Sequence, residues 1–437
     1  MENFNLFKIS RITRLEKIRI LVPIPVLPNR ISETTLIFKN VIPELKRKVE
    51  PHIIWLVYSP NKITNVQKKD NETILDIHDY CNFVEILEKT KPDIVYAMAN
   101  YSLIDFAVSS AAKYLEIPVI SKFMNKVAVV SKNMKKSLVS RIFENSMITD
   151  QDSEKQFMRR GRFFLYKWLF LVKTLNITKN RKDRGIISGL KILTYFANIG
   201  NQEGLPEFAN TMHWIESEKR RNRLLEFGYE PKSLIVTGNP LYDHAFKKLK
   251  ESKKIKNKKP IILFVPLSYY EHGIVTKSKN ETSFKEIVNT INKNDEVVFK
   301  IKIHPSSQQL EYYEQMIRDV DKNIQVFRDG DILQYVEEAD IVISYSGFSS
   351  SHIFSLLFNK PLILCNFFEF DKGPLLNEGI AIECNDVAKI NHQISLTLKN
   401  NTISTEKISK YINEFFYKTD GKSSERLSDL IIKTIKK

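Results

Sequence analysis

Short runs of apolar, mostly β-branched residues alternate with helix-like stretches along most of this chain, and the alternation restarts near residue 260. The strands predicted in the first half are residues 18–24, 53–58, 93–97, 118–122, 192–198, 212–216 and 233–237. Helical patterns separate them. Continuous apolar strands that alternate with helices predict a parallel sheet covered by helices on both faces.

The second half repeats the pattern. Its predicted strands are residues 260–266, 297–303, 325–327, 340–344 and 361–365. Residues 247–259 (KKLKESKKIKNKK) are basic and lack apolar periodicity, which is typical of a linker. The length of 437 residues suits two α/β cores. We therefore expect two doubly wound, Rossmann-like domains, residues 1–246 and 260–437, with ligands in the cleft at the carboxyl ends of their strands.

Several chemistries are disfavoured by missing motifs. PIPVLPNR follows the first strand in place of G-x-G-x-x-G, so a dinucleotide fingerprint is absent. The signatures of zinc proteases, P-loop NTPases and serine hydrolases do not occur. Cys81, Cys365 and Cys384 form no C-x-x-C pair, which argues for a reducing compartment. The first twenty residues lack a signal-peptide pattern, and no apolar run is long enough to span a membrane.

The balance of charge is strongly basic. Lys and Arg number 67 against 51 Asp and Glu, a formal net charge of +16. Such an excess favours an anionic partner, unless it only reflects a Lys-rich proteome. Part of it lies in residues 124–192, which interrupt the strand–helix rhythm as a basic, aromatic insertion. We interpret residues 155–184 as an interfacial segment for anionic lipid; the alternative is a core helix with a solvated basic edge.

Two candidate sites combine a charged side chain with a strand end. Gln202-Glu203-Gly204 follows the predicted strand 192–198, and a carboxylate in a cleft could deprotonate an acceptor hydroxyl. A surface turn is nevertheless the more common reason for a lone acidic residue before glycine. His304-Pro305 ends the strand 297–303, where the histidine could donate to a phosphate or simply cap the junction. Lys302 shares a face with His304 and adds positive charge.

Hydroxyl and amide groups supply the other candidates. The sequence SYSGFSSS leads from a strand into a helix, and Ser346, Ser349, Ser350 and Ser351 could form an anion site at the helix N-terminus or serve only as caps. Asn239 lies in the Gly-Asn-Pro turn that ends another strand. Residues 329–331 match D-x-D, but turn and N-cap roles explain these aspartates better than a metal site does.

The acidic-Gly turn, the His-Pro pair and the serine run together resemble the motifs of bacterial sialyltransferases and polysialyltransferases of GT-B fold. The His-Pro pair and DIVISYSGFSSSHIFSLLFNKPLIL are also similar to CDP-glycerol glycerophosphotransferases. This resemblance implies a CMP- or CDP-linked donor whose phosphate is held by His304 and by Ser349 to Ser351, without a metal or other cofactor. The sialyltransferases place two acids before the glycine, whereas Gln202 takes the first position here.

A second resemblance is to the non-hydrolysing UDP-N-acetylglucosamine 2-epimerases, which share this fold. It rests on residues 213–243 (HWIESEKRRNRLLEFGYEPKSLIVTGNPLYD) and 420–431 (DGKSSERLSDLI). The G-T-R-P-E and H-R-R-E-N motifs of those enzymes are missing here. PIPVLPNR and PLSYYEHG stand in their places.

These patterns favour a metal-independent GT-B glycosyltransferase that moves a sugar or polyol phosphate from a nucleotide-activated donor to a surface-glycan or lipid-linked acceptor. The first domain would bind the acceptor and the second the donor. Such an enzyme would be cytoplasmic and peripheral on the inner face of the cell membrane. A sugar-nucleotide epimerase is the alternative, and a catalytically inactive scaffold stays open. Nucleic acid is a poorer partner because the basic residues do not form a known recognition module.

Overall fold

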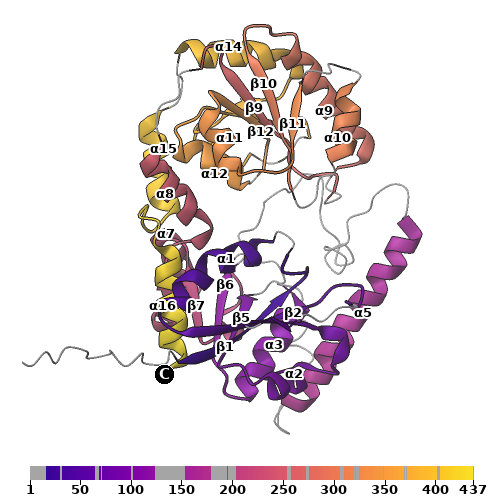
Figure 1. The fold of residues 1–437 in the computed structure, drawn as a ribbon, viewed down its shortest axis with the longest axis vertical. Coiled ribbons are helices and arrows are strands. Elements are labelled where there is room, and N and C mark those ends of the chain that lie inside the picture. Colours follow the sequence, from indigo (N-terminus) through magenta and orange to yellow (C-terminus); the bar gives the residue numbers. More distant parts are fainter. Residues whose placement is uncertain are drawn as a thin grey trace, which may run out of the picture.

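The computed structural model describes residues 16–29, 32–63, 68–69, 71–99, 102–123, 153–178, 194, 203–252, 257–271, 275–305, 310–318, 320, 324–347, 349–368, 370, 372–400 and 404–436. They form two α/β domains, one above the other in Figure 1. The expected strand at 192–198 falls almost entirely outside these ranges, as does much of the insertion at 124–192.

The first domain is built on a sheet with strand order β3-β4-β2-β1-β5-β6-β7-β8 among the described residues. Its strands are β1 (Lys17–Ile24), β2 (Glu50–Val57), β3 (Lys68–Lys69), β4 (Glu72–Asp76), β5 (Ile94–Ala99), β6 (Val119–Phe123), β7 (Met212–Ile215) and β8 (Leu234–Val236). All the pairs are parallel except β3 with β4. The strands predicted between residues 18 and 122 are confirmed, and so are the two after residue 211.

Helices cover both faces of this sheet. They are α1 (Glu33–Lys46), α2 (Phe83–Thr90), α3 (Leu103–Tyr114), α5 (Ser153–Thr178) and α7 (Glu218–Glu226). Because side chains alternate along a strand, Ile20 and Val22 pack with α1 on one face, while Leu21 packs with α2, α3 and α5 on the other. Both faces of the central strands are therefore buried, as a doubly wound fold requires.

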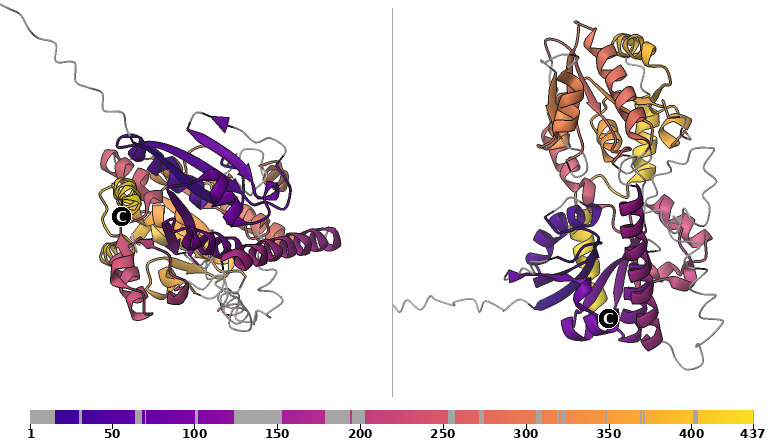
Figure 2. Two further views of the ribbon diagram at one scale, coloured as in Figure 1. Left: turned by 90° about the horizontal axis from the view of Figure 1, so that it is seen from below. Right: turned by 90° about the vertical axis from the view of Figure 1, so that its right-hand side faces the viewer.

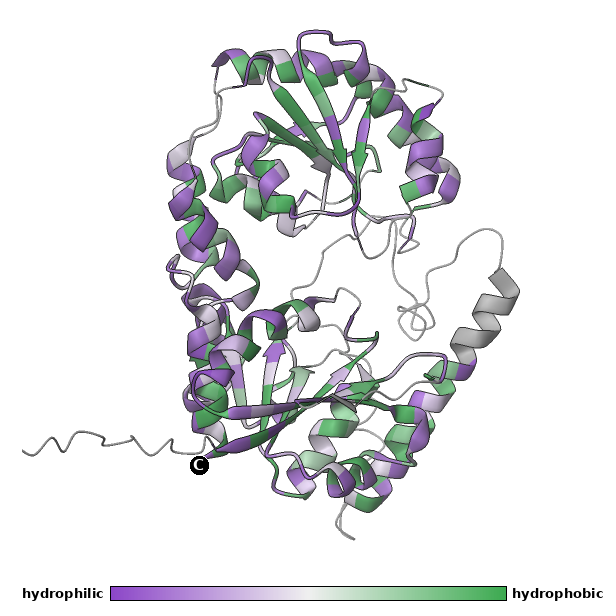
Figure 3. Cartoon of the chain, in the orientation of Figure 1, coloured by the Kyte–Doolittle hydropathy of each residue, from purple (hydrophilic) through white to green (hydrophobic). Residues whose placement is uncertain are grey.

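The second domain has the all-parallel strand order β11-β10-β9-β12-β13-β14 within the described ranges. Its strands are β9 (Ile261–Val265), β10 (Val298–Lys302), β11 (Gln325–Phe327), β12 (Ile341–Tyr345), β13 (Leu362–Cys365) and β14 (Ile382–Cys384). Its helices are α9 (Lys277–Asn292), α10 (Leu310–Arg318), α11 (Ile332–Glu338), α12 (Ser350–Leu357), α13 (Pro374–Asn377), α14 (Ile390–Asn400) and α15 (Thr405–Phe415). Hydrophobic strands lie inside a layer of more polar helices (Figure 3), and the predicted doubly wound architecture is confirmed.

The chain passes between the domains twice. Residues 247–251, expected in a linker, belong to helix α8 (Asp243–Glu251), because Ala245 and Phe246 supply it with an apolar face that packs in the core of the second domain. The last helix, α16 (Ser423–Ile435), was expected in the second domain. It lies beside α1 instead, with Leu427 and Ile431 in the first domain's core. The domain boundaries 1–246 and 260–437 thus remain a prediction. Helix α16 lies at the end of the chain but packs on the first domain.

Helix α5 runs along one side of the first domain and extends beyond it (Figure 2). Phe170, Leu171 and Leu175 are buried against α2 and α3, whereas Leu165 and Leu169 are exposed. The helix covers residues 155–178 of the proposed interfacial segment, and residues 179–184 lie outside the described ranges. No helix among the described residues is both long enough and apolar enough to cross a membrane.

Candidate functional site

A cavity of about 780 Å³ lies between the two domains, at the carboxyl edge of the second sheet. The first domain contributes one side through α1, with Leu36, Lys39, Asn40, Pro43, Glu44 and Arg47. The loops after β9 and β10, the starts of α11 and α12, and the first turn of α8 form the other side. We call this cavity the interdomain cleft. It occupies the position at which doubly wound sheets bind ligands.

The end of β10 brings Lys302, His304 and Pro305 to the cleft. Lys302 is almost fully buried, and its Nζ donates to the carbonyl oxygens of Ile303 (3.1 Å) and Arg328 (2.6 Å). Burial lowers the pKa of Lys302, and the carboxylates of Asp329 and Asp331 partly offset this. An ammonium has three donors, and two of those of Lys302 fix the loops that follow β10 and β11. His304 is exposed toward the cavity.

The serine run places three hydroxyl groups at the start of α12. Ser349 is the N-cap, and its Oγ accepts from the backbone N–H of Ser351 at 3.3 Å. The Oγ atoms of these two serines are 2.8 Å apart. Gly347 precedes them with φ of +139°, a conformation that favours glycine and turns the chain from β12 into the helix. Ser349, Ser350 and Ser351 all line the cleft, so the capping and ligand-binding interpretations apply to the same group of residues.

Two other candidates lie beneath the cleft surface. Ser346 is buried, and its Oγ has no hydrogen-bond partner among the described residues. Asn239 is also buried, and its Oδ1 accepts from the N–H of Leu241 at 3.0 Å, which caps a short 3-10 turn, η5 (Pro240–Tyr242). Leu241 lines the cleft, whereas neither Ser346 nor Asn239 does. Their predicted binding roles would therefore require movement of the covering backbone.

Glu203 lies outside the interdomain cleft. Its buried carboxylate pairs with Arg223 of α7 at 2.5 Å, and Arg220 of the same helix is 3.7 Å away. Both arginines belong to α7, so the carboxylate ties its turn to that helix at a place away from the cleft. The geometry therefore favours a structural role, and catalysis by Glu203 remains a prediction. Gln202 lies outside the described residues.

Motif reasoning missed the cleft residues contributed by helices. Lys39, Asn40 and Arg47 come from α1, and His244 and Lys247 come from α8. On α1 the signal is a face: Leu36, Asn40, Pro43 and Arg47 recur at helical spacing. On α8, Lys247 lies at the start of the basic stretch that the sequence predicts as a linker. The sequence of a polar helix face does not show whether that face borders a cleft or bulk solvent.

The three carboxylates that line the cleft all have partners. Glu44 pairs with Arg47 at 2.6 Å. Asp243 accepts from the N-terminal N–H groups of α16. Asp331 caps α11, as expected from the D-x-D match, and its Oδ2 is 2.9 Å from Nε2 of His244. Since Lys39 and Lys247 form no ion pair within the described chain, the uncompensated charge in the cleft is positive. Such a cavity suits an anionic ligand.

The segments 213–243 and 420–431 meet at the junction of the domains. Asp243 binds the start of α16, and Arg426 of that helix donates from Nε to the carbonyl oxygen of Thr237 at 2.7 Å. Arg426 also forms a bidentate pair with Asp420 (2.8 and 3.1 Å). Gly238 has φ of +82°, which favours glycine, and a Cβ there would lie 2.5 Å from the Oγ of Ser423, so any other residue would disturb this contact. The two segments therefore form one structural unit that positions α16.

Comparison with known proteins agrees with this architecture. The model of the UDP-N-acetylglucosamine 2-epimerase family matches residues 209–432. A curated relative, the teichoic acid poly(ribitol-phosphate) polymerase of Bacillus spizizenii, is 26% identical in an alignment of 252 residues that covers 50% of this chain and 36% of the relative. The matched region is thus only about a third of that polymerase.

Solved structures share the fold at low sequence identity. The S. aureus MnaA–UDP structure has a TM-score of 0.51 at 14% identity and covers 96% of this chain and 98% of its own. The UDP-GlcNAc 2-epimerase of Neisseria meningitidis has a TM-score of 0.50 at 15% identity, with coverages of 95% and 100%. The wall teichoic acid polymerase TagF has a TM-score of 0.50 at 11% identity, with coverages of 96% and 89%.

These neighbours confirm the predicted GT-B type of fold, in which two Rossmann-like domains face a cleft. The resemblance to the UDP-N-acetylglucosamine 2-epimerases is confirmed by the family model, and the resemblance to the CDP-glycerol glycerophosphotransferases by the two polymerases. The resemblance to the sialyltransferases stays a prediction. Because the family model matches just over half of its residues, the chain belongs to the UDP-N-acetylglucosamine 2-epimerase family.

Proposed function

We propose that the protein is a transferase that moves a sugar or polyol phosphate from a nucleotide-activated donor, CMP- or CDP-linked, to a glycan or lipid-linked acceptor. The observation that carries this proposal is the meeting of His304 and Ser349 to Ser351 in one positively charged cleft. The similarity to two teichoic acid polymerases supports the same class of reaction.

The second domain would bind the donor phosphates. The positive end of the α12 helix dipole favours an anion, and the hydroxyl of Ser350 and the ring of His304 could each donate to a phosphate oxygen. Lys39 and Lys247 would face the same charge from α1 and α8. Donors fixed in this way stabilise the charge that develops on the departing nucleotide, so the step needs no metal in this proposal.

The acceptor hydroxyl requires a proton acceptor, for which the sequence suggested Glu203. The cleft offers a second candidate, His244, whose Nε2 is oriented by the Asp331 carboxylate at 2.9 Å. A histidine held by a carboxylate is a common arrangement for a general base. We propose His244 as a second candidate base in addition to Glu203, because only His244 lines the cleft.

A nucleotide panel tests the donor proposal. Isothermal titration with CMP, CDP, UDP and UDP-N-acetylglucosamine should show preferential binding of the cytidine nucleotides, and binding should persist in a metal chelator. The matched variant Ser350→Ala should weaken that binding. Binding of UDP-N-acetylglucosamine in preference to every cytidine nucleotide would contradict the proposed donor class.

The family match gives a second candidate function, an epimerase acting on a sugar nucleotide. Incubation with UDP-N-acetylglucosamine followed by NMR would detect the 2-epimer directly. We favour the transferase because the G-T-R-P-E and H-R-R-E-N motifs of the epimerases are missing from this sequence.

We further propose that the acceptor is carried on lipid and that α5 meets the membrane surface. Leu165 and Leu169 are 54% and 49% exposed on one face of this helix, with the exposed basic residues Arg162 and Lys173 beside them. Exposed leucines flanked by cations suit an anionic lipid surface. In this proposal the protein is peripheral on the cytoplasmic face of the membrane.

A further inference from the structure

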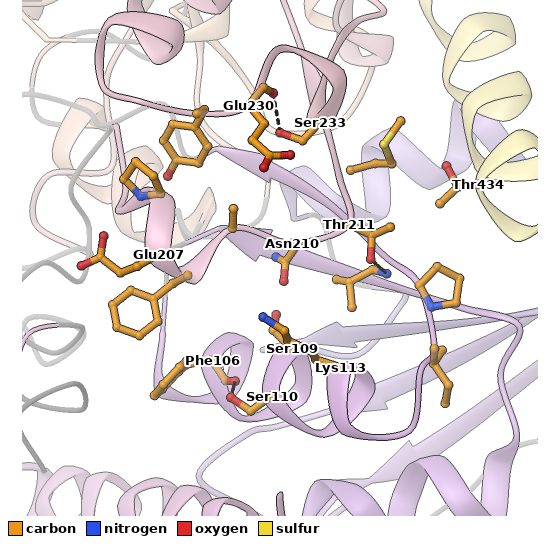
Figure 4. Close-up of a pocket in the computed structure, with 18 of the residues that line it drawn as sticks. Phe106, Ser109, Ser110, Lys113, Glu207, Asn210, Thr211, Glu230, Ser233 and Thr434 are labelled. Carbon is orange, nitrogen blue, oxygen red and sulfur yellow. Dashed lines mark hydrogen bonds between the residues drawn. The ribbon is translucent and has the colours of Figure 1, made fainter. Parts of the chain in front are cut away.

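A second cavity, of about 1030 Å³, lies within the first domain, away from the interdomain cleft. It opens at the amino ends of β6, β7 and β8, where Pro118, Thr211 and Ser233 lie. Helix α3, the short 3-10 turn η3 (Pro206–Phe208) and the end of α16 complete its wall (Figure 4). We call it the amino-edge pocket. Ligands of the proposed reaction approach the opposite edge of the strands, so this pocket is not part of the reacting site.

Polar side chains with free hydrogen-bonding capacity line the amino-edge pocket. Ser109 and Lys113 come from α3, Glu207 comes from η3, and Asn210 precedes β7. Within the described part of the chain, none of these four side chains forms a hydrogen bond or an ion pair. Asn210 and Ser109 lie on facing sides of the pocket (Figure 4). The group offers ammonium and amide donors together with carboxylate, amide and hydroxyl acceptors.

Apolar surface lies beside these groups. Phe106 and Phe208 meet edge to face with ring centroids 5.2 Å apart, and both line the pocket with Ile117 and Leu175. A ligand that fits this pocket must present a C–H-rich face to the aromatic rings and must carry polar groups along its own edge.

The charge of the pocket excludes a strongly anionic ligand. Its lining contains two lysines, Lys113 and Lys232, and three glutamates, Glu116, Glu207 and Glu230. Lys232 is already paired with Glu230 at 3.1 Å. A phosphate group in this pocket would lie near the carboxylates of Glu116 and Glu207, and only Lys113 would offset their repulsion. The interdomain cleft has the opposite balance of charge. An uncharged ligand with many hydroxyl groups matches both the charge and the shape.

We propose that the amino-edge pocket binds an uncharged saccharide unit. This inference rests on the proposed function, in which the substrate is a glycan: the pocket would hold a sugar residue of the acceptor remote from its reacting end. The rings of Phe106 and Phe208 would pack on the sugar face, and Asn210, Glu207 and Ser109 would bond to its hydroxyl groups.

Saturation-transfer NMR on the full chain tests the proposal, with cellobiose, maltotriose and diacetylchitobiose as neutral probes and glycerol 3-phosphate as the anionic one. At least one neutral probe should bind, in preference to glycerol 3-phosphate and without displacement by CMP or UDP. Asn210→Ala and Glu207→Gln should each weaken that binding about three- to tenfold, as expected for one lost hydrogen bond.

Two control variants locate the effect. Ser110→Ala changes a pocket residue whose hydroxyl is already bonded to the Phe106 carbonyl at 2.8 Å, so binding should be retained. His304→Ala changes the interdomain cleft, so it should weaken nucleotide binding and leave the saccharide signal intact. If no neutral probe binds, or if binding is lost in His304→Ala and kept in Asn210→Ala, the proposal that the amino-edge pocket binds a saccharide is wrong. Failure of the nucleotide panel would instead count against the proposed function.

Discussion

Asp243 accepts two hydrogen bonds from Ser424, one from its backbone N–H and one from its hydroxyl, both at 2.6 Å, across 181 residues of sequence. Asp243 begins α8, and Ser424 lies in the first turn of α16. A third bond comes from the N–H of Ser423 at 3.0 Å. The carboxylate thus satisfies N–H groups that a helix start leaves free, and it joins the element that enters the second domain to the one that returns from it.

Asp243→Ala should therefore destabilise the whole chain. Hydrogen bonds to a charged group contribute about 1.5–3 kcal/mol, and the buried N–H groups of α16 would lose their partner. Urea unfolding followed by circular dichroism measures the change. Asp429→Ala is the control, because this exposed residue of α16 only pairs with Lys48 at the surface and should change stability by about 1 kcal/mol or less. Equal effects of the two variants would show that Asp243 does not hold the helix.

At the donor site, Ser350→Ala and His304→Ala should weaken nucleotide binding with little change in melting temperature. Each lost hydrogen bond to phosphate is expected to reduce the binding free energy by about 1.5–3 kcal/mol. Ser349→Ala should behave differently, because Ser349 caps α12 and loss of an N-cap costs about 0.5–2 kcal/mol of stability. Calorimetry with the preferred nucleotide and thermal unfolding separate the two effects. Unchanged affinity in both Ser350→Ala and His304→Ala would remove them from the donor site.

Sequence patterns located the residues that follow strands and missed those that depend on distant packing. Lys302, His304 and Ser349 to Ser351 were found because carboxyl ends of parallel strands share one edge. Lys39 and His244 were missed, since the face of a helix that meets a cleft is decided by the other domain. The ion pair of Glu203 with Arg223 was likewise invisible, because it joins a turn to a helix that follows the next strand.

The cysteines illustrate the same limit. Cys365 and Cys384 are 19 positions apart in sequence and form no recognised motif, yet they are register partners on the adjacent strands β13 and β14. Both are buried. Strand order in a parallel sheet is set by the crossover connections, so only the folded topology brings such residues together.

Glu271 gives the protein a specific dependence on pH. Burial raises the pKa of this carboxyl to about 7, although Tyr313 donates to its Oε1 at 3.0 Å. The folded state therefore holds a proton that the unfolded chain loses near its ordinary pKa of 4.5. The stability that this group contributes is present below pH 4.5 and is lost as the pH rises to 7.

Glu271→Gln should remove this loss of stability between pH 4.5 and 7. The variant should gain melting temperature relative to the parent as the pH rises from 4.5 to 7, and the difference should stay constant above that range. Scanning calorimetry at several pH values measures it. Glu311→Gln, which makes the same change at an exposed position of α10, is the control. A difference between Glu271→Gln and the parent that does not change with pH would contradict this account.

The membrane proposal predicts opposite results for neighbouring residues of α5. Leu165→Ser with Leu169→Ser should reduce co-sedimentation with anionic vesicles and leave the fold intact, since both side chains are exposed. Phe170→Ser should destabilise the protein, because Phe170 is 3% exposed and packs edge to face on Phe83 at 5.1 Å. Phe170 is thus unsuitable for a vesicle-binding test. Full vesicle binding by the double leucine variant, at both low and high salt, would rule out this face.

The last prediction distinguishes the two candidate bases. If Glu203 is structural, Glu203→Gln removes the charge that pairs with Arg223, so it should lower stability and leave turnover within about tenfold of the parent. His244→Gln should retain donor affinity and lower turnover by roughly 10²–10⁴-fold, because it removes a proton acceptor held at 2.9 Å from Asp331. Turnover assays on both variants complete the comparison: turnover lost in His244→Gln and kept in Glu203→Gln identifies the histidine as the base. The reverse pattern, with a stable Glu203→Gln variant that has lost turnover and a fully active His244→Gln variant, would assign proton transfer to Glu203 and require that turn to move into the cleft.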